Sequence, residues 1–353
     1  MKITANQVTV LRILVLPIPC YALIARPPQP WMWVAFVFGT LAGATDFVDG
    51  WLARKDGPTV LGSLLDPVAD KLFIAMLLLP LVASGECPGW AAGALVVREL
   101  LITTLRTSLA VRKQSLKTSA LGKLKTVVQM GGIATYYLTL FVPRPQMPWV
   151  HLACATGMAA FAVFLAVRAR GWPPAWILGG TPLWYGVGVL ALFLDPHEVA
   201  FWQFIAMVVL TWVSGADYLW GAGRTLLAAG LAVQDLLRSL WSFVHGLALV
   251  PVLGEHPHIV VPVIVSVCAE LSYGGVDNGV AAEQARFAKG SPLPTTVLAV
   301  VVGVCAWGGF VDESTLAILA WILAAVSLAN AAVAFALDRA VFLLGPGQKL
   351  GAA

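Results

Sequence analysis

Charged residues are scarce in this sequence. Of its 353 residues only 11% are Asp, Glu, Lys or Arg, whereas 59% are hydrophobic. Apolar runs about 20 residues long, the length at which a helix spans a bilayer, recur along the whole chain. The composition therefore excludes an ordinary soluble core and predicts an all-α fold, a polytopic membrane helix bundle with about 12 spans.

Cysteine is also sparse. The five cysteines occur singly, mostly inside apolar runs, at positions 20, 87, 154, 268 and 305. This scatter argues against a disulfide framework and a zinc site, and it is typical of small buried side chains. Arg12 interrupts the N-terminal apolar run, and no small-residue cleavage site follows that run. We therefore expect a retained first helix instead of a cleaved secretory signal.

Basic residues are few, but their distribution is informative. The expected spans are 8–25, 31–54, 66–84, 89–112, 124–142, 149–167, 174–194, 199–220, 226–253, 258–281, 293–311 and 315–345. Lys and Arg concentrate in alternate loops between these spans, which predicts that both termini and the basic loops face the cytoplasm. The net charge of +4 is modest, so we expect no nucleic acid among the partners.

Four carboxylates stand out in the stretch from residue 44 to residue 71. Asp46 and Asp49 are three residues apart, with Gly50 on the same helical face, and Asp66 and Asp70 are four apart. Two antiparallel helices would present two carboxylates each to a common point. Oxygen ligands without His or Cys select Mg²⁺ or Mn²⁺, ions that are typically shared with substrate phosphates.

The alternative is that these acids form salt bridges with Arg and Lys at the membrane boundary. A charged side chain near the bilayer core costs at least about 2.5 kcal/mol on insertion scales, and such residues usually mark function. Four acids interleaved with Gly, Ala and Arg54 at this spacing are therefore better explained as a metal site.

The same residues closely resemble the signature of the CDP-alcohol phosphotransferase (CDP-alcohol phosphatidyltransferase) family, D-x-x-D-G-x-x-A-R followed by G-x-x-x-D-x-x-x-D. Every position of the signature is filled, by Asp46, Asp49, Gly50, Ala53, Arg54, Gly62, Asp66 and Asp70. The loop between Arg54 and Gly62 is one residue shorter than the family pattern. The exact position of Arg54 is the part of the motif that this departure leaves open.

The resemblance implies a six-helix transmembrane core, usually a homodimer, in a bacterial-type inner membrane, with the active site facing the cytoplasm. It implies two divalent ions, Mg²⁺ or Mn²⁺, that bind the pyrophosphate of a CDP-linked lipid. The implied metal ligands are Asp46, Asp49, Asp66 and Asp70, and Asp70 is also the candidate general base. The nucleotide site would contain Gly50, Ala53, Arg54 and Gly62, together with Asn6 and Thr9.

Three further segments, 6–12, 97–106 and 121–130, resemble the phosphatidylglycerophosphate synthase branch of this family. The branch implies CDP-diacylglycerol as donor, sn-glycerol 3-phosphate as acceptor and membrane lipids as surroundings. The acceptor phosphate needs cations, which Arg98, Arg106, Lys123 and Lys125 would supply. Anchoring at the membrane surface is the alternative for the two lysines, and inositol phosphate, serine or phosphatidylglycerol are alternative acceptors.

The segment 208–220 resembles the closing helix of the family, which would make 144–195 an inserted two-helix hairpin. We therefore expect residues 1–225 to form the catalytic membrane domain, and 226–353 to form a C-terminal transmembrane domain of unknown role. The most polar part of this tail contains Glu270, Asp277, Asn278 and Glu283. We interpret it as a capped helix end with a Gly-Gly kink or as a subunit interface, in preference to a second site, because no metal-like spacing accompanies the acids.

Two other classes of function were considered. A transporter would also explain about 12 spans and buried acids, but it predicts broken, repeat-related helices at the bilayer midplane. Here the acids crowd toward the expected cytoplasmic edge without an inverted repeat, so a transporter remains an alternative for the tail alone. A purely structural lipid-binding protein would be expected to lose one of the four aspartates, and none is missing.

Overall fold

The computed structural model describes residues 4–57, 59–114, 121–169, 175–230 and 232–343. Within these ranges only the backbone is described for 46–56, 121–124, 126–127, 165, 168–169, 175–176 and 217. The described residues form helices joined by turns, without a strand, and six of their helical segments are long and apolar enough to cross a membrane. The chain is thus a polytopic helical membrane protein, and the expected total of about 12 spans stays a prediction.

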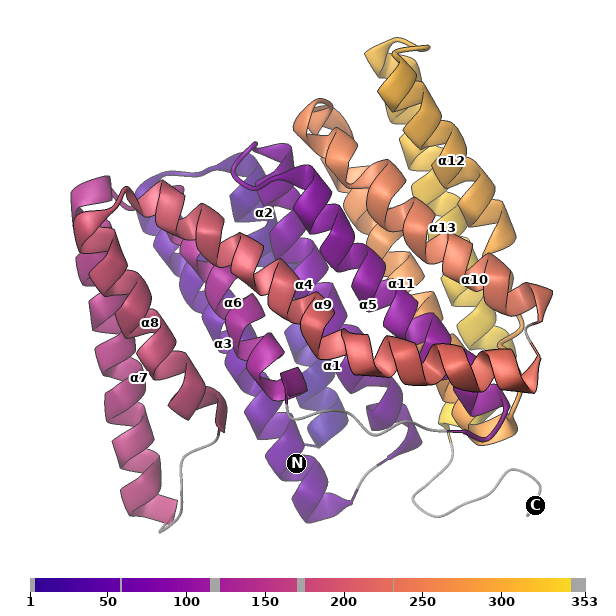
Figure 1. Cartoon of the computed structure of the whole chain (residues 1–353), viewed down its shortest axis with the longest axis horizontal. Coiled ribbons are helices and arrows are strands. Elements are labelled where there is room, and N and C mark those ends of the chain that lie inside the picture. The colour runs from indigo at the N-terminus through magenta and orange to yellow at the C-terminus, as the bar shows by residue number, and fades with distance from the viewer. Residues whose placement is uncertain (1–3, 58, 115–120, 170–174, 231, 344–353) are drawn as a thin grey trace. The chain divides into compact units, whose positions relative to one another are not determined.

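The chain divides into two compact units. The first unit, residues 1–117 and 216–353, contains the following helices: α1 (Ala5–Val15), α2 (Pro17–Ala25), α3 (Gln29–Asp56), α4 (Val60–Ala83), α5 (Gly89–Val111), the end of α9 (Pro196–Ala229), α10 (Val233–Phe243), α11 (Val260–Gln284), α12 (Leu293–Gly308) and α13 (Glu313–Phe342) (Figure 1). The second unit, residues 118–215, contains α6 (Leu121–Thr139), α7 (Met147–Ala169), α8 (Ala175–Phe193) and the start of α9.

Short helical segments of other types complete the chain. A π-helix (Val244–Leu249) follows α10, and three 3₁₀ turns occur at Arg144–Gln146, Pro251–Gly254 and Pro257–Ile259. The expected span 226–253 is therefore not one regular helix. The contacts group the tail with the first five helices, whereas the assignment of 1–225 to the catalytic domain and of 144–195 to an insertion stays a prediction.

The first expected span consists of two helices. The α1 helix starts at a capping box in which the Gln7 backbone N–H donates to the Thr4 hydroxyl (3.4 Å) and the Thr4 N–H donates to the Gln7 side chain (3.0 Å). Pro17 has no N–H group and begins α2, as is usual for proline in the first turn of a helix. The α2 helix ends at Ala25, and its C-cap residue Arg26 lies in the left-handed region with φ 46°.

The α4 helix begins at Val60, earlier than the expected start at residue 66, because Thr59 caps it. The Thr59 hydroxyl accepts a hydrogen bond from the Gly62 backbone N–H (2.9 Å), which satisfies one of the open donors of the first turn. Pro67 lies inside this helix and removes one intrahelical hydrogen bond.

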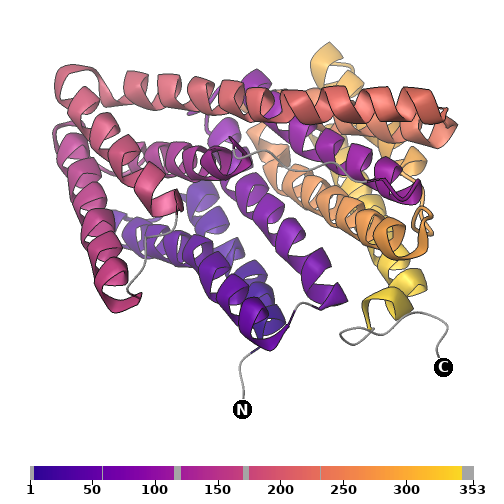
Figure 2. The same ribbon diagram turned by 60° about the horizontal axis from the view of Figure 1, so that its bottom comes forward.

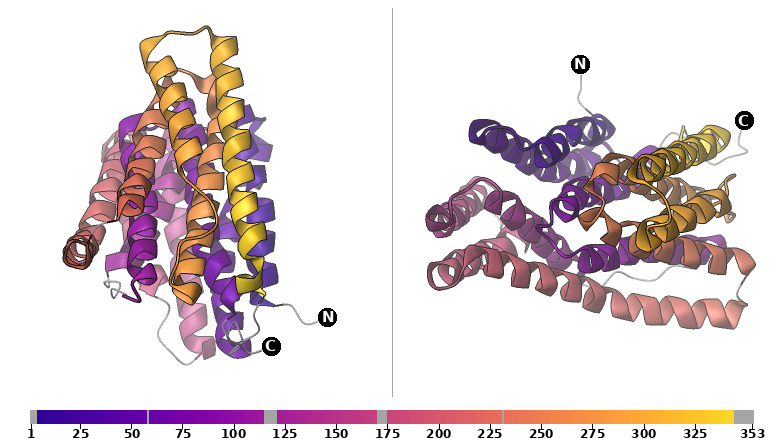
Figure 3. Two further views of the ribbon diagram at one scale, coloured as in Figure 1. Left: turned by 90° about the vertical axis from the view of Figure 1, so that its right-hand side faces the viewer. Right: turned by 90° about the horizontal axis from the view of Figure 1, so that it is seen from above.

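The helices of the first unit pack around α4, α5 and α11. The α11 helix contacts α4, α5 and α13 (Figure 1, Figure 2), and α12 packs along α13 as an antiparallel neighbour (Figure 3). The core between α4 and α5 is built from buried aliphatic residues such as Leu78, Leu95 and Leu100. The most polar residues of α4 thus belong to a helix that is packed on several sides.

The second unit is a separate apolar assembly. Its α8 helix contacts α7 and α6. The buried His151 ring lies 5.0 Å from the Trp184 ring and forms a 2.8 Å hydrogen bond with the Met147 carbonyl through Nδ1. Gln129 donates a hydrogen bond to Thr211 (3.3 Å). These polar groups are paired inside the unit.

Candidate active site

Side chains of α1 bind the two aspartates of α4. The Thr9 hydroxyl donates a hydrogen bond to Asp66 Oδ1 (3.1 Å), and Arg12 Nη1 donates to Asp70 Oδ1 (3.0 Å). Residues three or four apart on a helix share a face. The contacts Thr9–Asp66 and Arg12–Asp70 therefore lie along one interface between α1 and α4, called the seam below. Since both numbers increase together along this seam, α1 and α4 run parallel. Asp66 and Asp70 lie one turn apart on α4, and the seam holds both carboxylates against α1.

The same seam continues to the N-terminus of α4. The Thr59 hydroxyl donates a hydrogen bond to Asn6 Oδ1 (3.1 Å) while it accepts from the Gly62 N–H. A Cβ atom on Gly62 would lie only 2.9 Å from Asn6 Oδ1 and 3.0 Å from Thr59 Oγ1. The structure therefore brings together Asn6 and Gly62, two of the residues predicted for the nucleotide site, and only glycine leaves this contact unstrained.

Burial differs sharply between the two partners of the ion pair. The Arg12 side chain is 1% exposed, whereas that of Asp70 is 50% exposed. A buried guanidinium held among apolar helices is a fixed donor, and a charge-assisted hydrogen bond to it orients the carboxylate. Asp70 is thus held in place from the protein side and remains accessible to a ligand.

A second polar network connects α4 with α5. Lys71 donates a hydrogen bond to the Thr103 hydroxyl, which in turn donates to the Glu99 carbonyl (2.7 Å). The Glu99 carboxylate accepts from Arg98 Nη1 (3.1 Å). Arg98, predicted to bind the acceptor phosphate, is only 8% exposed. Its neighbours place it in the helix interface of the same unit as Asp66 and Asp70.

The structure gives less information on the other three residues that were predicted to bind the acceptor phosphate. The Arg106 guanidinium lies 5.4 Å from the centroid of the Tyr218 ring, a cation–π distance, and it is exposed. Lys125 belongs to α6 in the second unit, and the Lys123 side chain lies outside the described ones. The four-residue acceptor site therefore stays a prediction.

The predicted metal ligands are divided between α3 and α4. The structure gives the backbone of α3 through Asp46 and Asp49, but the side chains of Asp46, Asp49, Gly50, Ala53 and Arg54 lie outside the described ones. Asp66 and Asp70 supply carboxylate oxygens one helical turn apart, and their partners Thr9 and Arg12 are a hydroxyl and a cation. A donor set of carboxylates alone fits a hard divalent ion such as Mg²⁺ or Mn²⁺.

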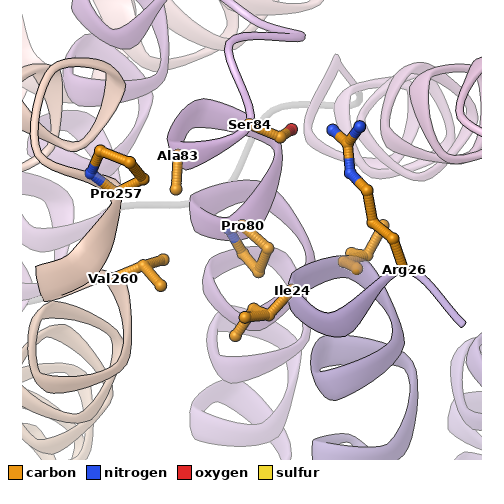
Figure 4. Close-up of a pocket in the computed structure, with 8 residues that line it drawn as sticks. Ile24, Arg26, Pro80, Ala83, Ser84, Pro257 and Val260 are labelled. Atoms are coloured by element: carbon orange, nitrogen blue, oxygen red, sulfur yellow. The ribbon is translucent and has the colours of Figure 1, made fainter.

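A cavity of about 270 Å³ lies at the other end of α4. It is lined by Leu23, Ile24, Arg26, Pro80, Ala83, Ser84, Pro257 and Val260 (Figure 4). At 1.5 Å per helical residue, Pro80 is about 20 Å along α4 from Asp66. Arg26 at its rim pairs with Glu86 (3.4 Å). This cavity is therefore separate from the carboxylates.

The acids of the tail have protein partners. The buried Glu270 accepts a hydrogen bond from Trp241 Nε1 (2.7 Å), and the buried Asp277 accepts from Arg238 (2.6 Å) and from the Ala288 backbone N–H (2.8 Å). The α11 helix runs unbroken from Val260 to Gln284, so it continues well beyond the Gly274–Gly275 pair. Asp277 thus holds the segment after α11 in place.

Four polar residues of this unit were not predicted from the sequence as site residues. They are Arg12, Thr59, Lys71 and Thr103. Arg12 carried a usable signal, because a cation inside an apolar helix normally faces a polar partner. The partners themselves depend on packing between helices more than 30 residues apart in the chain, which local sequence patterns do not encode.

Comparisons with known proteins agree with the resemblance of the motif. A family model for CDP-alcohol phosphatidyltransferase matches residues 2–167. The CDP-diacylglycerol–glycerol-3-phosphate 3-phosphatidyltransferase of Bacillus subtilis is 33% identical over 182 residues, which are 47% of this chain and 90% of the relative. The probable phosphatidylglycerophosphate synthase of Mycobacterium tuberculosis H37Rv is 36% identical over 166 residues, 46% of this chain and 76% of the relative.

A third relative is the CDP-diacylglycerol–glycerol-3-phosphate 3-phosphatidyltransferase of Rickettsia bellii, 34% identical over 134 residues, which are 38% of this chain and 74% of the relative. No solved structure matches the chain. The matches cover most of each relative but less than half of this chain, so much of the sequence here has no counterpart in them. With the complete aspartate motif on α3 and α4, these matches show that the chain belongs to the CDP-alcohol phosphatidyltransferase family and is an enzyme of that class.

Proposed function

We propose that this enzyme transfers the phosphatidyl group of CDP-diacylglycerol to sn-glycerol 3-phosphate, giving phosphatidylglycerophosphate and CMP. The names of the relatives support this substrate pair. The observation that carries the proposal is the seam between α1 and α4, which holds Asp66 and the half-exposed Asp70 against α1. Such fixed carboxylates suit a reaction that depends on positioning and charge stabilisation.

Two Mg²⁺ or Mn²⁺ ions held by Asp46, Asp49, Asp66 and Asp70 would neutralise the pyrophosphate of the donor and the charge of the departing CMP. The residues of the chain perform the remaining steps. Asp70 accepts the proton of the acceptor hydroxyl, whose oxygen forms a bond to the β-phosphorus, while the bond from that phosphorus to the bridging oxygen breaks and CMP leaves. Asn6, Thr59 and Gly62 form a compact wall beside these carboxylates, where the nucleotide binds.

The acceptor phosphate is bound by basic residues from α5 and α6 in this proposal. Arg98 and Arg106 lie on α5, and Lys123 and Lys125 lie on α6. The site faces the cytoplasm of a bacterial-type inner membrane, because the basic loops around these helices follow the positive-inside rule. The homodimer implied by the family stays a prediction.

The test is CMP release by the purified full chain in detergent micelles containing CDP-diacylglycerol and Mg²⁺. Separate reactions receive sn-glycerol 3-phosphate, inositol phosphate, serine or phosphatidylglycerol. We expect CMP release that depends on Mg²⁺ and on glycerol 3-phosphate, with phosphatidylglycerophosphate as the lipid product. Release with another acceptor but not with glycerol 3-phosphate would refute the acceptor assignment while leaving the family assignment intact.

A further inference from the structure

Helix α11 of the tail packs directly against the helix that carries Asp66 and Asp70. A Cβ atom added to Gly275 would lie 2.2 Å from Val68 Cγ2 and 3.3 Å from Leu64 Cδ1. Carbon atoms in contact are normally about 3.5–4.0 Å apart. Only glycine at position 275 therefore permits the observed approach of α11 to α4.

The contact with α11 lies on the opposite side of α4 from the aspartates. Val68 is two residues from both Asp66 and Asp70, which on an α-helix corresponds to a rotation of about 200°. The aspartates bind Thr9 and Arg12 of α1, whereas Val68 meets Gly275. The α4 helix is thus clamped between α1 and α11 at the level of its carboxylates.

The neighbouring glycine makes a similar approach to α5. A Cβ on Gly274 would lie 3.2 Å from Thr103 Cγ2 and 3.5 Å from the Trp241 ring. Thr103 accepts the hydrogen bond of Lys71, the residue that follows Asp70. Through Gly274 and Gly275, α11 contacts both helices that are linked by the polar network beside Asp70.

We infer that Gly275 is a positioning residue for the phosphatidyl transfer, and that the tail helix α11 sets the distance of Asp66 and Asp70 from the rest of the site. The inference rests on the proposed function for its activity assay. Its physical basis is that Val68 is β-branched and stiff at χ1 in a helix. A methyl group at 275 must therefore push α4 and α11 apart, and a displacement of the carboxylates by about 1 Å can reduce a rate by about 10²-fold.

The test compares three variants of the full chain: Gly275→Ala, Gly279→Ala and the double variant Gly275→Ala/Val68→Ala. Gly279 is the matched control, because it lies on the same helix and a Cβ there would meet Phe342 of α13 at 2.7 Å, within the tail. Both single changes have the same effect on helix propensity. Val68→Ala removes the atom that the new methyl group would meet.

Each variant is measured for kcat, for the Mg²⁺ concentration that gives half-maximal rate, and for the rise in melting temperature caused by Mg²⁺ with CDP. We expect Gly275→Ala to lower kcat about 10- to 100-fold and to raise the half-maximal Mg²⁺ concentration. Gly279→Ala should change neither, and the double variant should recover most of both. Loss of folded protein alone would lower the rate without moving the Mg²⁺ dependence.

The inference is overturned if Gly275→Ala matches Gly279→Ala in kcat and Mg²⁺ dependence, or if the double variant is no better than Gly275→Ala. If Gly275→Ala yields no folded protein, Gly274→Ala tests the neighbouring, milder contact of α11 with Thr103, the partner of Lys71. An unchanged Mg²⁺ dependence there counts against the inference. If the wild-type chain releases no CMP with any acceptor, the proposed function fails, while the melting-temperature measurement still decides the inference.

Discussion

The acidic residues on α4 and those on α11 differ in how far they are exposed. Asp70 has a side chain that is 50% exposed, whereas Glu270 is fully buried and Asp277 is 2% exposed. Asp277 accepts hydrogen bonds from Arg238 and from the Ala288 backbone N–H, and both donors belong to the tail. An acid enclosed by protein donors stabilises packing, whereas a half-exposed acid keeps surface that a ligand can reach. The two helices touch through Val68 and Gly275, on the side of α4 that faces away from the aspartates.

Removing the charge of Asp70 should have the largest effect on activity. Asp70→Asn keeps the shape of the side chain but takes away the proton acceptor and a predicted metal ligand. We expect kcat to fall by about 10²- to 10⁴-fold, the usual contribution of a positioned acid or base. The melting temperature should fall less than in Asp277→Asn, because Asp70 is half-exposed and asparagine keeps an oxygen that can accept the hydrogen bond of Arg12. CMP release and thermal unfolding in detergent measure the two properties.

The matched control for this change is Glu283→Gln on α11, since Glu283 is an exposed acid outside the seam. It should retain wild-type turnover. Wild-type turnover in Asp70→Asn would remove Asp70 from the mechanism, and equal losses in both variants would point to a general effect of surface charge.

The opposite pattern is expected for Asp277→Asn. This change leaves the buried Arg238, which is 3% exposed, without its countercharge. Breaking a buried pair in this way lowers the free energy of unfolding by about 3–5 kcal/mol. The melting temperature should drop clearly, with a smaller effect on kcat of the folded fraction than Asp70→Asn produces.

The double variant Arg238→Met/Asp277→Leu tests whether the loss of stability comes from the unpaired charge of Arg238. It removes both charges and should recover part of the lost stability, because buried pairs are often replaceable by apolar residues. A melting temperature of Asp277→Asn equal to that of the wild type would show that the pair does not stabilise the tail.

The sequence predicted the membrane class and the aspartate motif because both depend on local patterns. Apolar runs identify spans, and Asp66 and Asp70 share a face through their spacing alone. The first span contains a break at Pro17 and the span expected at 226–253 contains a π-helix. Such breaks depend on capping and side-chain contacts that hydropathy averages out.

The packing of the tail is the feature that the sequence did not reveal. Gly274 and Gly275 were interpreted only as a kink near a helix end, whereas the structure shows that they also approach Thr103 and Val68 closely. These contacts join residues about 170 or more positions apart, and a glycine pair gives no indication of its partner. The link between Arg12 and Asp70 was missed for the same reason, although an isolated arginine in an apolar run was visible.

Arg12→Lys tests whether the buried partner of Asp70 acts by geometry as well as charge. Lysine keeps the charge but lacks the planar donor group of arginine, so Asp70 should be held less precisely. We expect kcat to fall about 10-fold, less than the loss from full misplacement of a reacting group, with a higher Mg²⁺ requirement. Arg286→Lys, which alters the ion pair with Asp338 in the tail, is the control and should leave both values unchanged.

The smallest predicted effect comes from Gly62→Ala at the start of the seam. The new methyl group would lie 2.9 Å from Asn6 Oδ1 and 3.0 Å from Thr59 Oγ1, so these side chains must shift by a few tenths of an ångström. An overpacking cost of about 1 kcal/mol corresponds to roughly a fivefold rise in KM for CDP-diacylglycerol, with little change in kcat. Gly223→Ala is the control, because a Cβ there meets nothing within 4 Å. An unchanged KM in Gly62→Ala would place the nucleotide away from Asn6 and Thr59, and would confine the function of the seam to holding Asp66 and Asp70.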